Sequence, residues 1–152
     1  MHFNDSNYEV LYVTGKQDYD EIKNVKFPKN IKVVPYIENM TRIMKNTDLI
    51  VTRAGASTLS EIIALNLPSI LIPSPYVPNN HQYINAMDLV NENAGILMEE
   101  KNLDSKKLVN EIDSLLNNED KLKEMKVNLN KLKVENSATI IYNNIKKLIG
   151  DK

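Results

Sequence analysis

Short apolar runs alternate with amphipathic stretches over the first hundred residues. Runs of three or four aliphatic and β-branched residues are typical of strands buried in a parallel sheet. We predict such strands at residues 10–13, 31–34, 48–51, 69–72 and 96–98. Between them the apolar residues recur at helical spacing, which predicts helices over residues 18–25, 39–46, 58–66 and 80–92. The alternation predicts an α/β fold: a Rossmann-like parallel sheet flanked by helices.

Beyond residue 100 the apolar pattern is helical throughout. Asp104 is a good N-cap for a helix over residues 104–116. The next helix carries a stripe of apolar residues spaced three, four and three apart, namely Leu122, Met125, Leu129 and Leu132. This stripe is too short for a coiled coil and therefore predicts packing against a core. A last amphipathic helix is expected over residues 137–149.

The stretch from residue 48 to residue 86 has the pattern strand, sharp turn, helix, strand, loop, helix. Gly55 is expected to let the backbone turn tightly after the first of these strands. Thr58 and Glu61 have the spacing of a capping box, which predicts Thr58 as N-cap and Glu61 at the third helical position. Asn66, which tolerates the left-handed conformation, should end the helix. In such a unit the helix N-terminus lies at the carboxyl edge of the sheet, where we expect ligands to bind.

Composition restricts the class of protein without identifying it. The 152 residues fit one domain, and 42% hydrophobic with 26% charged residues is ordinary for a globular protein. A net charge of −1 gives no overall attraction to nucleic acid or anionic membrane. The absence of cysteine excludes disulfides and thiolate metal sites. With four glycines there is neither a dinucleotide fingerprint nor a P-loop. No apolar run approaches the about 20 residues of a membrane span, so we expect a cytoplasmic protein.

Three motifs together resemble the C-terminal, donor-binding half of the MurG family. They are Pro35-Tyr-Ile-Glu-Asn-Met40, Thr52-Arg-Ala-Gly-Ala-Ser-Thr-Leu-Ser-Glu61 and His81-Gln82 with Asn85-Ala86, joined by Pro68 and Pro73. This family of bacterial transferases moves GlcNAc from UDP-GlcNAc onto the lipid-linked muramoyl-pentapeptide precursor of peptidoglycan. The resemblance extends over nearly the whole chain. It implies a hexosyltransferase that forms a β-1,4 link during cell wall biosynthesis, with inversion of configuration at the anomeric carbon.

The resemblance also implies how the chain is organised. Members of the family have two Rossmann-like domains in a GT-B arrangement, and we expect residues 1–152 to form a single donor-binding domain of that kind. Its first strand and Gly-rich turn would be missing, together with the N-terminal domain that binds the lipid-linked acceptor. The full-length protein would then be peripheral on the cytoplasmic face of the membrane, and this chain alone would be inactive.

The resemblance assigns roles at the two ends of the donor. The backbone of Ile37 would face the uracil edge, and Glu61 would accept hydrogen bonds from the ribose hydroxyls. Gln82 and Asn85, with His81 beside them, would bind the GlcNAc hydroxyls. These five positions match the motifs quoted above residue by residue.

The turn before residue 61 is implied to bind the diphosphate. Gly55, Ala56 and Ser57, with Thr58 next to them, would bring backbone N–H groups close to the diphosphate and sugar. Arg53 lies at the start of the turn, where its guanidinium could order the site or contact phosphate. Converging N–H groups at a helix N-terminus stabilise a departing diphosphate without a metal ion, and no Asp-x-Asp pair is placed here to hold one. We therefore expect no cofactor and no metal, and we nominate no catalytic residue.

Simpler explanations exist for each of these side chains. Glu61 is explained by the capping box alone, and Arg53 by an exposed charge after a strand. His81 could be a solvated loop histidine, while Gln82 and Asn85 fit the polar start of a helix.

Other functions also remain open. The chain could be a non-catalytic nucleotide-sugar-binding subunit that docks to a separate membrane-bound partner. A UDP-GlcNAc 2-epimerase-like isomerase is disfavoured because that family expects adjacent acidic residues, whereas Glu61 is followed by Ile62. A plain interaction domain would leave the pattern of residues 52–61 unexplained.

Overall fold

The computed structural model describes residues 8–133 and 137–150. The chain divides into two compact units, residues 1–46 and residues 47–152. The expectation of a single donor-binding domain over residues 1–152 stays a prediction. No helix within the described ranges is both long enough and apolar enough to cross a bilayer.

The first unit contains a pair of parallel strands. β1 (Val10–Val13) pairs with β2 (Ile31–Val34) in register from Val10 opposite Ile31 to Val13 opposite Val34. Both strands have the predicted bounds. α1 (Tyr19–Ile22) and α2 (Met40–Met44) are shorter than predicted. α2 begins one residue after the predicted start, and the Asn39 side chain caps it by accepting a hydrogen bond from the Arg42 N–H at 3.0 Å.

The second unit contains a parallel sheet with the strand order β3-β4-β5. The strands are β3 (Ile50–Thr52), β4 (Ser69–Leu71) and β5 (Ile96–Leu97). α3 (Ala56–Leu65) connects β3 to β4, and the short helix η2 (Pro78–Asn80) with α4 (His81–Val90) connects β4 to β5. These connections are the crossovers that parallel strands require. The predicted α/β fold with parallel strands flanked by helices is therefore confirmed.

Burial differs between the central and outer strands of this sheet. All three residues of β4 are buried, as predicted. β3 was expected to be buried on both faces, but this is wrong because its Val51 is 38% exposed. Within the three-stranded sheet β3 has one neighbouring strand, whereas β4 has two.

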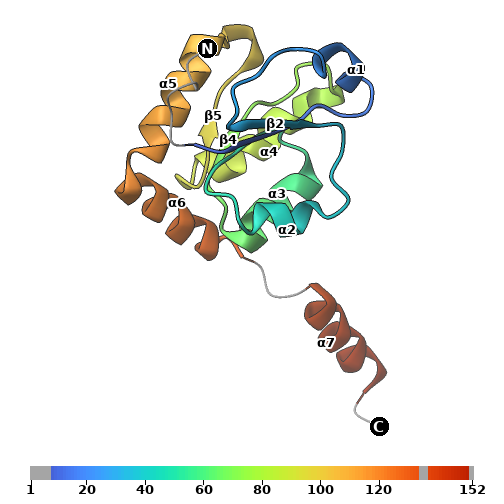
Figure 1. Cartoon of the computed structure of the whole chain (residues 1–152). Helices are drawn as coiled ribbons and strands as arrows, with labels where there is room; N and C mark the ends of the chain where they lie inside the picture. The colour runs from blue at the N-terminus through green and yellow to red at the C-terminus, as the bar shows by residue number, and fades with distance from the viewer. Residues whose placement is uncertain (1–7, 134–136, 151–152) are drawn as a thin grey trace. The chain divides into compact units, whose positions relative to one another are not determined.

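The remaining helices complete the core of the second unit. η3 (Glu100–Asn102) leads into α5 (Ser105–Leu116) and α6 (Glu119–Lys131). Figure 1 shows α5 and α6 following one another along one side of β4 and β5. Leu115 and Met125 pack with Ile70 of β4 in one buried cluster. The stripe on residues 122–132 thus packs against the core, as its spacing predicted.

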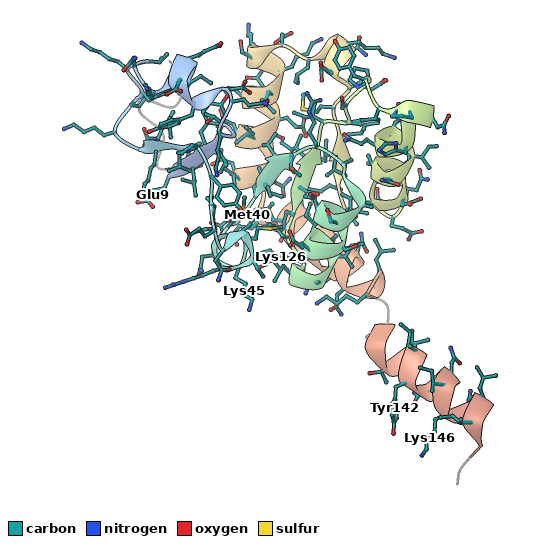
Figure 2. The ribbon with its side chains drawn as sticks, turned by 90° about the vertical axis from the view of Figure 1, so that its right-hand side faces the viewer. Glu9, Met40, Lys45, Lys126, Tyr142 and Lys146 are labelled. Carbon is teal, nitrogen blue, oxygen red and sulfur yellow. The ribbon has the colours of Figure 1, made fainter. Side chains whose placement is uncertain are left out.

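α7 (Ser137–Ile149) has the predicted bounds. Its apolar residues Ile141, Ile145 and Leu148 are exposed. Figure 2 shows Tyr142 and Lys146, one helical turn apart, projecting from the same side of this helix.

Candidate functional site

The carboxyl ends of β3, β4 and β5 lie at one edge of the three-stranded sheet, because the strands are parallel. The segments that follow them are the turn at residues 53–55, the loop at residues 72–77 and the segment at residues 98–102. Nine of the ten predicted site residues lie in the second unit, on the first two of these segments or on the helices that follow them. The tenth, Ile37, lies in the first unit.

α3 begins three residues earlier than predicted from Thr58 as N-cap. Its N-cap is Gly55, and no side chain caps it. The predicted capping box of Thr58 and Glu61 is therefore wrong. The error arose because a capping box presupposes a side-chain cap, whereas here the backbone passes directly from the extended Gly55 into the helix. Asn66 ends the helix in the left-handed conformation (φ 51°, ψ 43°), as predicted.

The start of α3 presents backbone N–H groups that make no hydrogen bond within the helix. The first intrahelical hydrogen bond runs from the Leu59 N–H to the Gly55 carbonyl at 3.0 Å. The N–H groups of Ala56, Ser57 and Thr58 precede it and so have no partner within the helix. The first turn of α3 contains no acidic residue. The positive end of the helix dipole is thus not offset by a carboxylate of that turn, which suits the site to an anion.

Glu61 lies in the second turn of α3, one turn after Ser57, and its side chain is exposed. Because α3 has no capping box, capping of the helix does not explain why a carboxylate stands at this position. No hydrogen bond or ion pair to it is found in the part of the chain that the structure describes. An exposed carboxylate of this kind can accept hydrogen bonds from a ligand.

The start of α4 is tied to the same edge of the sheet. Gln82 Oε1 accepts a hydrogen bond from the Ser74 N–H at 2.8 Å, in the loop that follows β4. Asn85 Nδ2 donates to the Ala54 carbonyl at 3.3 Å, in the turn that follows β3. The structure therefore ties Gln82 to the loop that follows β4 and Asn85 to the turn that begins α3, across 31 residues of sequence in the case of Asn85.

His81 is held in one orientation at the beginning of α4. Its Nδ1 lies 2.8 Å from the Pro78 carbonyl oxygen. A carbonyl can only accept, so Nδ1 carries the proton and Nε2 is the nitrogen left for another partner. Asn79 and Asn80, directly before it, both adopt positive φ angles of 53° and 51°. Asparagine tolerates this conformation well, which explains the two residues at this bend.

Arg53 is not a free exposed charge. Its Nη1 donates to the Ile72 carbonyl at 3.2 Å and forms an ion pair with the Glu100 carboxylate. Sequence reasoning missed Glu100 and Ser74 as parts of this edge. Glu100 could have been considered from its position, since it follows the short strand predicted at residues 96–98.

Ile37 lies in the loop between β2 and α2, and its side chain is half-buried. Its proposed contact with the base stays a prediction. Among the residues that the structure describes, no group of three or more His, Asp or Glu side chains is arranged to hold a metal ion.

Parallel strands joined by helices, with polar loops and a helix N-terminus at the carboxyl edge, define a Rossmann-like α/β domain of the kind that binds nucleotides. The chain belongs to the family described as the glycosyltransferase family 28 C-terminal domain, and the model of that family matches residues 2–141.

Sequence relatives are bacterial transferases. The chain is 41% identical over 151 residues to the UDP-N-acetylglucosamine–N-acetylmuramyl-(pentapeptide) pyrophosphoryl-undecaprenol N-acetylglucosamine transferase of Bacillus cytotoxicus, covering 97% of this chain and 42% of the relative. The transferase of the same name from Bacillus licheniformis is 42% identical over 147 residues, covering 93% of this chain and 40% of the relative. The chain thus spans about two fifths of the length of these relatives.

Solved structures give the same fold. Acinetobacter baumannii MurG has a TM-score of 0.77 and 26% identity, over 90% of this chain and 40% of that chain. The glycosyltransferase VinC, solved in complex with dTDP, has a TM-score of 0.67 and 16% identity, over 84% of this chain and 30% of that chain. The fold is that of one half of a GT-B glycosyltransferase, and the resemblance to the MurG family is confirmed.

Proposed function

We propose that this chain is the UDP-GlcNAc-binding part of a transferase that adds GlcNAc to the lipid-linked muramoyl-pentapeptide precursor of peptidoglycan. The names of the Bacillus relatives support this assignment. The single observation that carries it is that the start of α3 and the Asn85 side chain of α4 lie at the same edge of the sheet. The N–H groups that begin α3 have no partner within the helix, and they follow closely after Ala54, to which Asn85 of α4 is hydrogen-bonded.

The diphosphate of the donor binds at the start of α3 in this proposal. The N–H groups of Ala56, Ser57 and Thr58 donate to its oxygens, with Gly55 allowing close approach. Negative charge builds on the diphosphate as the bond between the sugar and UDP breaks. Fixed donors and the helix dipole stabilise that charge without having to reorganise.

The two ends of the donor are bound by side chains and by one backbone segment. Glu61 accepts hydrogen bonds from the ribose hydroxyls, and the backbone of Ile37 pairs with the uracil edge. Gln82 uses its Oε1 to accept from Ser74. Its Nε2 hydrogens are therefore the groups that it offers to the oxygens of GlcNAc. Asn85, with His81 beside it, completes the sugar contacts.

The acceptor, the base that activates it and the membrane surface belong to other parts of the full-length protein in this proposal. We assign no catalytic residue to the 152 residues of this chain. The full-length protein works at the cytoplasmic face of the membrane, where the lipid-linked acceptor is held.

Calorimetric titration of the chain with UDP, UDP-GlcNAc and ADP tests the donor assignment. We expect UDP and UDP-GlcNAc to bind and ADP to bind more weakly. Glu61→Ala should weaken UDP binding by about tenfold or more, because a hydrogen bond to a charged group is worth roughly 1.5–3 kcal/mol. Equal affinities for ADP and UDP would contradict the uridine assignment, and no binding of UDP would contradict the donor site itself.

Glu92→Ala is the matched control for that titration. Glu92 is also an exposed carboxylate of the second unit, and it lies just beyond the C-terminal end of α4. A crossover helix returns the chain to the amino edge of a parallel sheet, so this residue lies away from the proposed site. Its loss should leave UDP affinity unchanged.

A further inference from the structure

One guanidinium joins the segments that follow all three strands of the second unit. Arg53 is the first residue after β3. Its Nη1 donates to the carbonyl of Ile72, the first residue after β4, at 3.2 Å. The same nitrogen forms an ion pair with Glu100, three residues after β5. Arg53 thereby connects the turn that begins α3 to the other two loops at the carboxyl edge.

The Glu100 side chain is the less exposed partner of this ion pair. Its side chain is 31% exposed, against 51% for Arg53. Glu100 also borders a small hollow of about 50 Å³ that the loop residues Pro73 and Pro75 help to form. A partly exposed ion pair contributes little to global stability. What it does here is fix where the guanidinium lies.

We propose that Glu100 is a positioning residue for the donor site. Its carboxylate holds Arg53 in the geometry in which Arg53 also donates to Ile72. These two contacts of Arg53, with Glu100 and with Ile72, are called the brace; they keep the turn at residues 53–57 in place against the neighbouring loops. The diphosphate is then bound by the main-chain N–H groups of α3, while the charge of Arg53 is balanced by Glu100. This inference deepens the proposed function and rests on it wherever UDP binding is the readout.

Amide exchange measured by NMR tests the brace without any ligand. Three backbone hydrogen bonds report on the carboxyl edge: Leu59 N–H to the Gly55 carbonyl, Ile72 N–H to the Thr52 carbonyl and Met98 N–H to the Leu71 carbonyl. Glu100→Gln and Arg53→Gln should each speed exchange at these amides by roughly threefold or more, because local opening becomes easier. The amides of Leu67 and Ala94, bonded to the carbonyls of Ile62 and Leu89 away from that edge, should be unchanged. Unchanged exchange at Leu59, Ile72 and Met98 in Glu100→Gln would overturn the proposal.

Glu99→Gln is the matched control. Glu99 lies on the same segment and pairs with Lys101 at 2.9 Å rather than with Arg53. The substitution removes the same charge one residue away, so it separates the brace from a general change in electrostatics. It should alter neither amide exchange at the carboxyl edge nor UDP affinity. An effect as large as that of Glu100→Gln would argue against a specific role for Glu100.

UDP affinity distinguishes the brace from direct phosphate binding by Arg53. If Glu100 positions Arg53, Glu100→Gln weakens UDP binding by roughly three- to tenfold. The double variant Arg53→Gln/Glu100→Gln should then be no weaker than Arg53→Gln alone, because both changes remove one interaction. If Arg53 instead binds phosphate directly, Glu100→Gln would tighten UDP binding by freeing the guanidinium, and that result would overturn the proposal. A wild-type chain that bound no UDP would contradict the proposed function, while amide exchange would still test the brace.

Discussion

Gly55 lies between β3 and α3 in a backbone conformation that any L-amino acid can adopt. Its φ is −71° and its ψ is 142°. A Cβ atom built there would meet Thr58 Oγ1 at 3.8 Å, an ordinary contact. The turn that Gly55 was expected to allow therefore does not depend on the conformational freedom of glycine. What the missing side chain leaves open is the approach of a ligand to the N–H groups that follow.

Gly55→Ala should therefore separate folding from binding. We expect the free energy of unfolding to stay unchanged or to rise by up to about 1 kcal/mol, because alanine restricts the unfolded chain. UDP affinity should fall, because the new methyl group obstructs the diphosphate. Urea unfolding and calorimetric titration of the same preparation measure the two effects.

Gly15 provides the contrasting control. Its φ is +81°, so Gly15→Ala should cost about 1–2 kcal/mol of stability through backbone strain. A large loss of stability in Gly55→Ala, with no separate loss of affinity, would contradict the ligand-approach explanation.

At the scale of the secondary-structure elements, local pattern predicted most of the fold. The strands of the first unit, α7 and the left-handed end of α3 at Asn66 have their predicted positions. Each depends on residues close together in sequence. The start of α3 was misplaced because Thr58 and Glu61 satisfy a local rule that the backbone at Gly55 makes unnecessary.

The candidate site was less accessible to sequence reasoning. The motifs pointed to Gln82 and Asn85, but not to their hydrogen bonds with Ser74 and Ala54. Nor did they pair Arg53 with Glu100, which is 47 residues away. Such contacts depend on how the loops at the sheet edge meet after folding, and spacing along the chain carries no information on that.

The link between Gln82 and Ser74 predicts two separable roles for one side chain. Gln82→Ala should speed amide exchange at Ser74, because the N–H loses its acceptor. Gln82→Glu keeps an acceptor oxygen and should retain slow exchange. Both variants should lose affinity for UDP-GlcNAc relative to UDP if the Nε2 hydrogens bind the sugar. Unchanged discrimination in both variants would restrict Gln82 to holding the loop.

α6 anchors the helical side of the second unit through Met125, which is fully buried in the cluster with Ile70 and Leu115. Met125→Ala should lower the free energy of unfolding by about 2–5 kcal/mol, because it leaves a cavity in a packed core. Val127→Ala is the control on the same helix, since Val127 is 57% exposed and its truncation should cost less than about 0.5 kcal/mol. Chemical denaturation followed by circular dichroism measures both. Equal losses would mean that α6 does not pack as described.

At the scale of the whole molecule, binding of the donor and transfer of GlcNAc depend on different sets of residues in this proposal. The residues that we assign to the donor all lie within a chain that spans about two fifths of its Bacillus relatives. Transfer also needs a bound acceptor and a base that takes the proton from its attacking hydroxyl. Neither is assigned to any residue of this chain.

We therefore expect the purified chain to bind UDP-GlcNAc without transferring GlcNAc to a lipid-linked muramoyl-pentapeptide. Tight binding of the donor alone cannot lower the barrier, because catalysis requires interactions that are stronger in the transition state. The measurement is acceptor-dependent release of UDP, with the full-length Bacillus licheniformis transferase as positive control. Release that depended on the acceptor and was lost in Glu61→Ala would show that these 152 residues hold a complete active site. Release without dependence on acceptor would instead indicate hydrolysis of the donor, with water reaching the sugar carbon that the acceptor attacks in the complete enzyme.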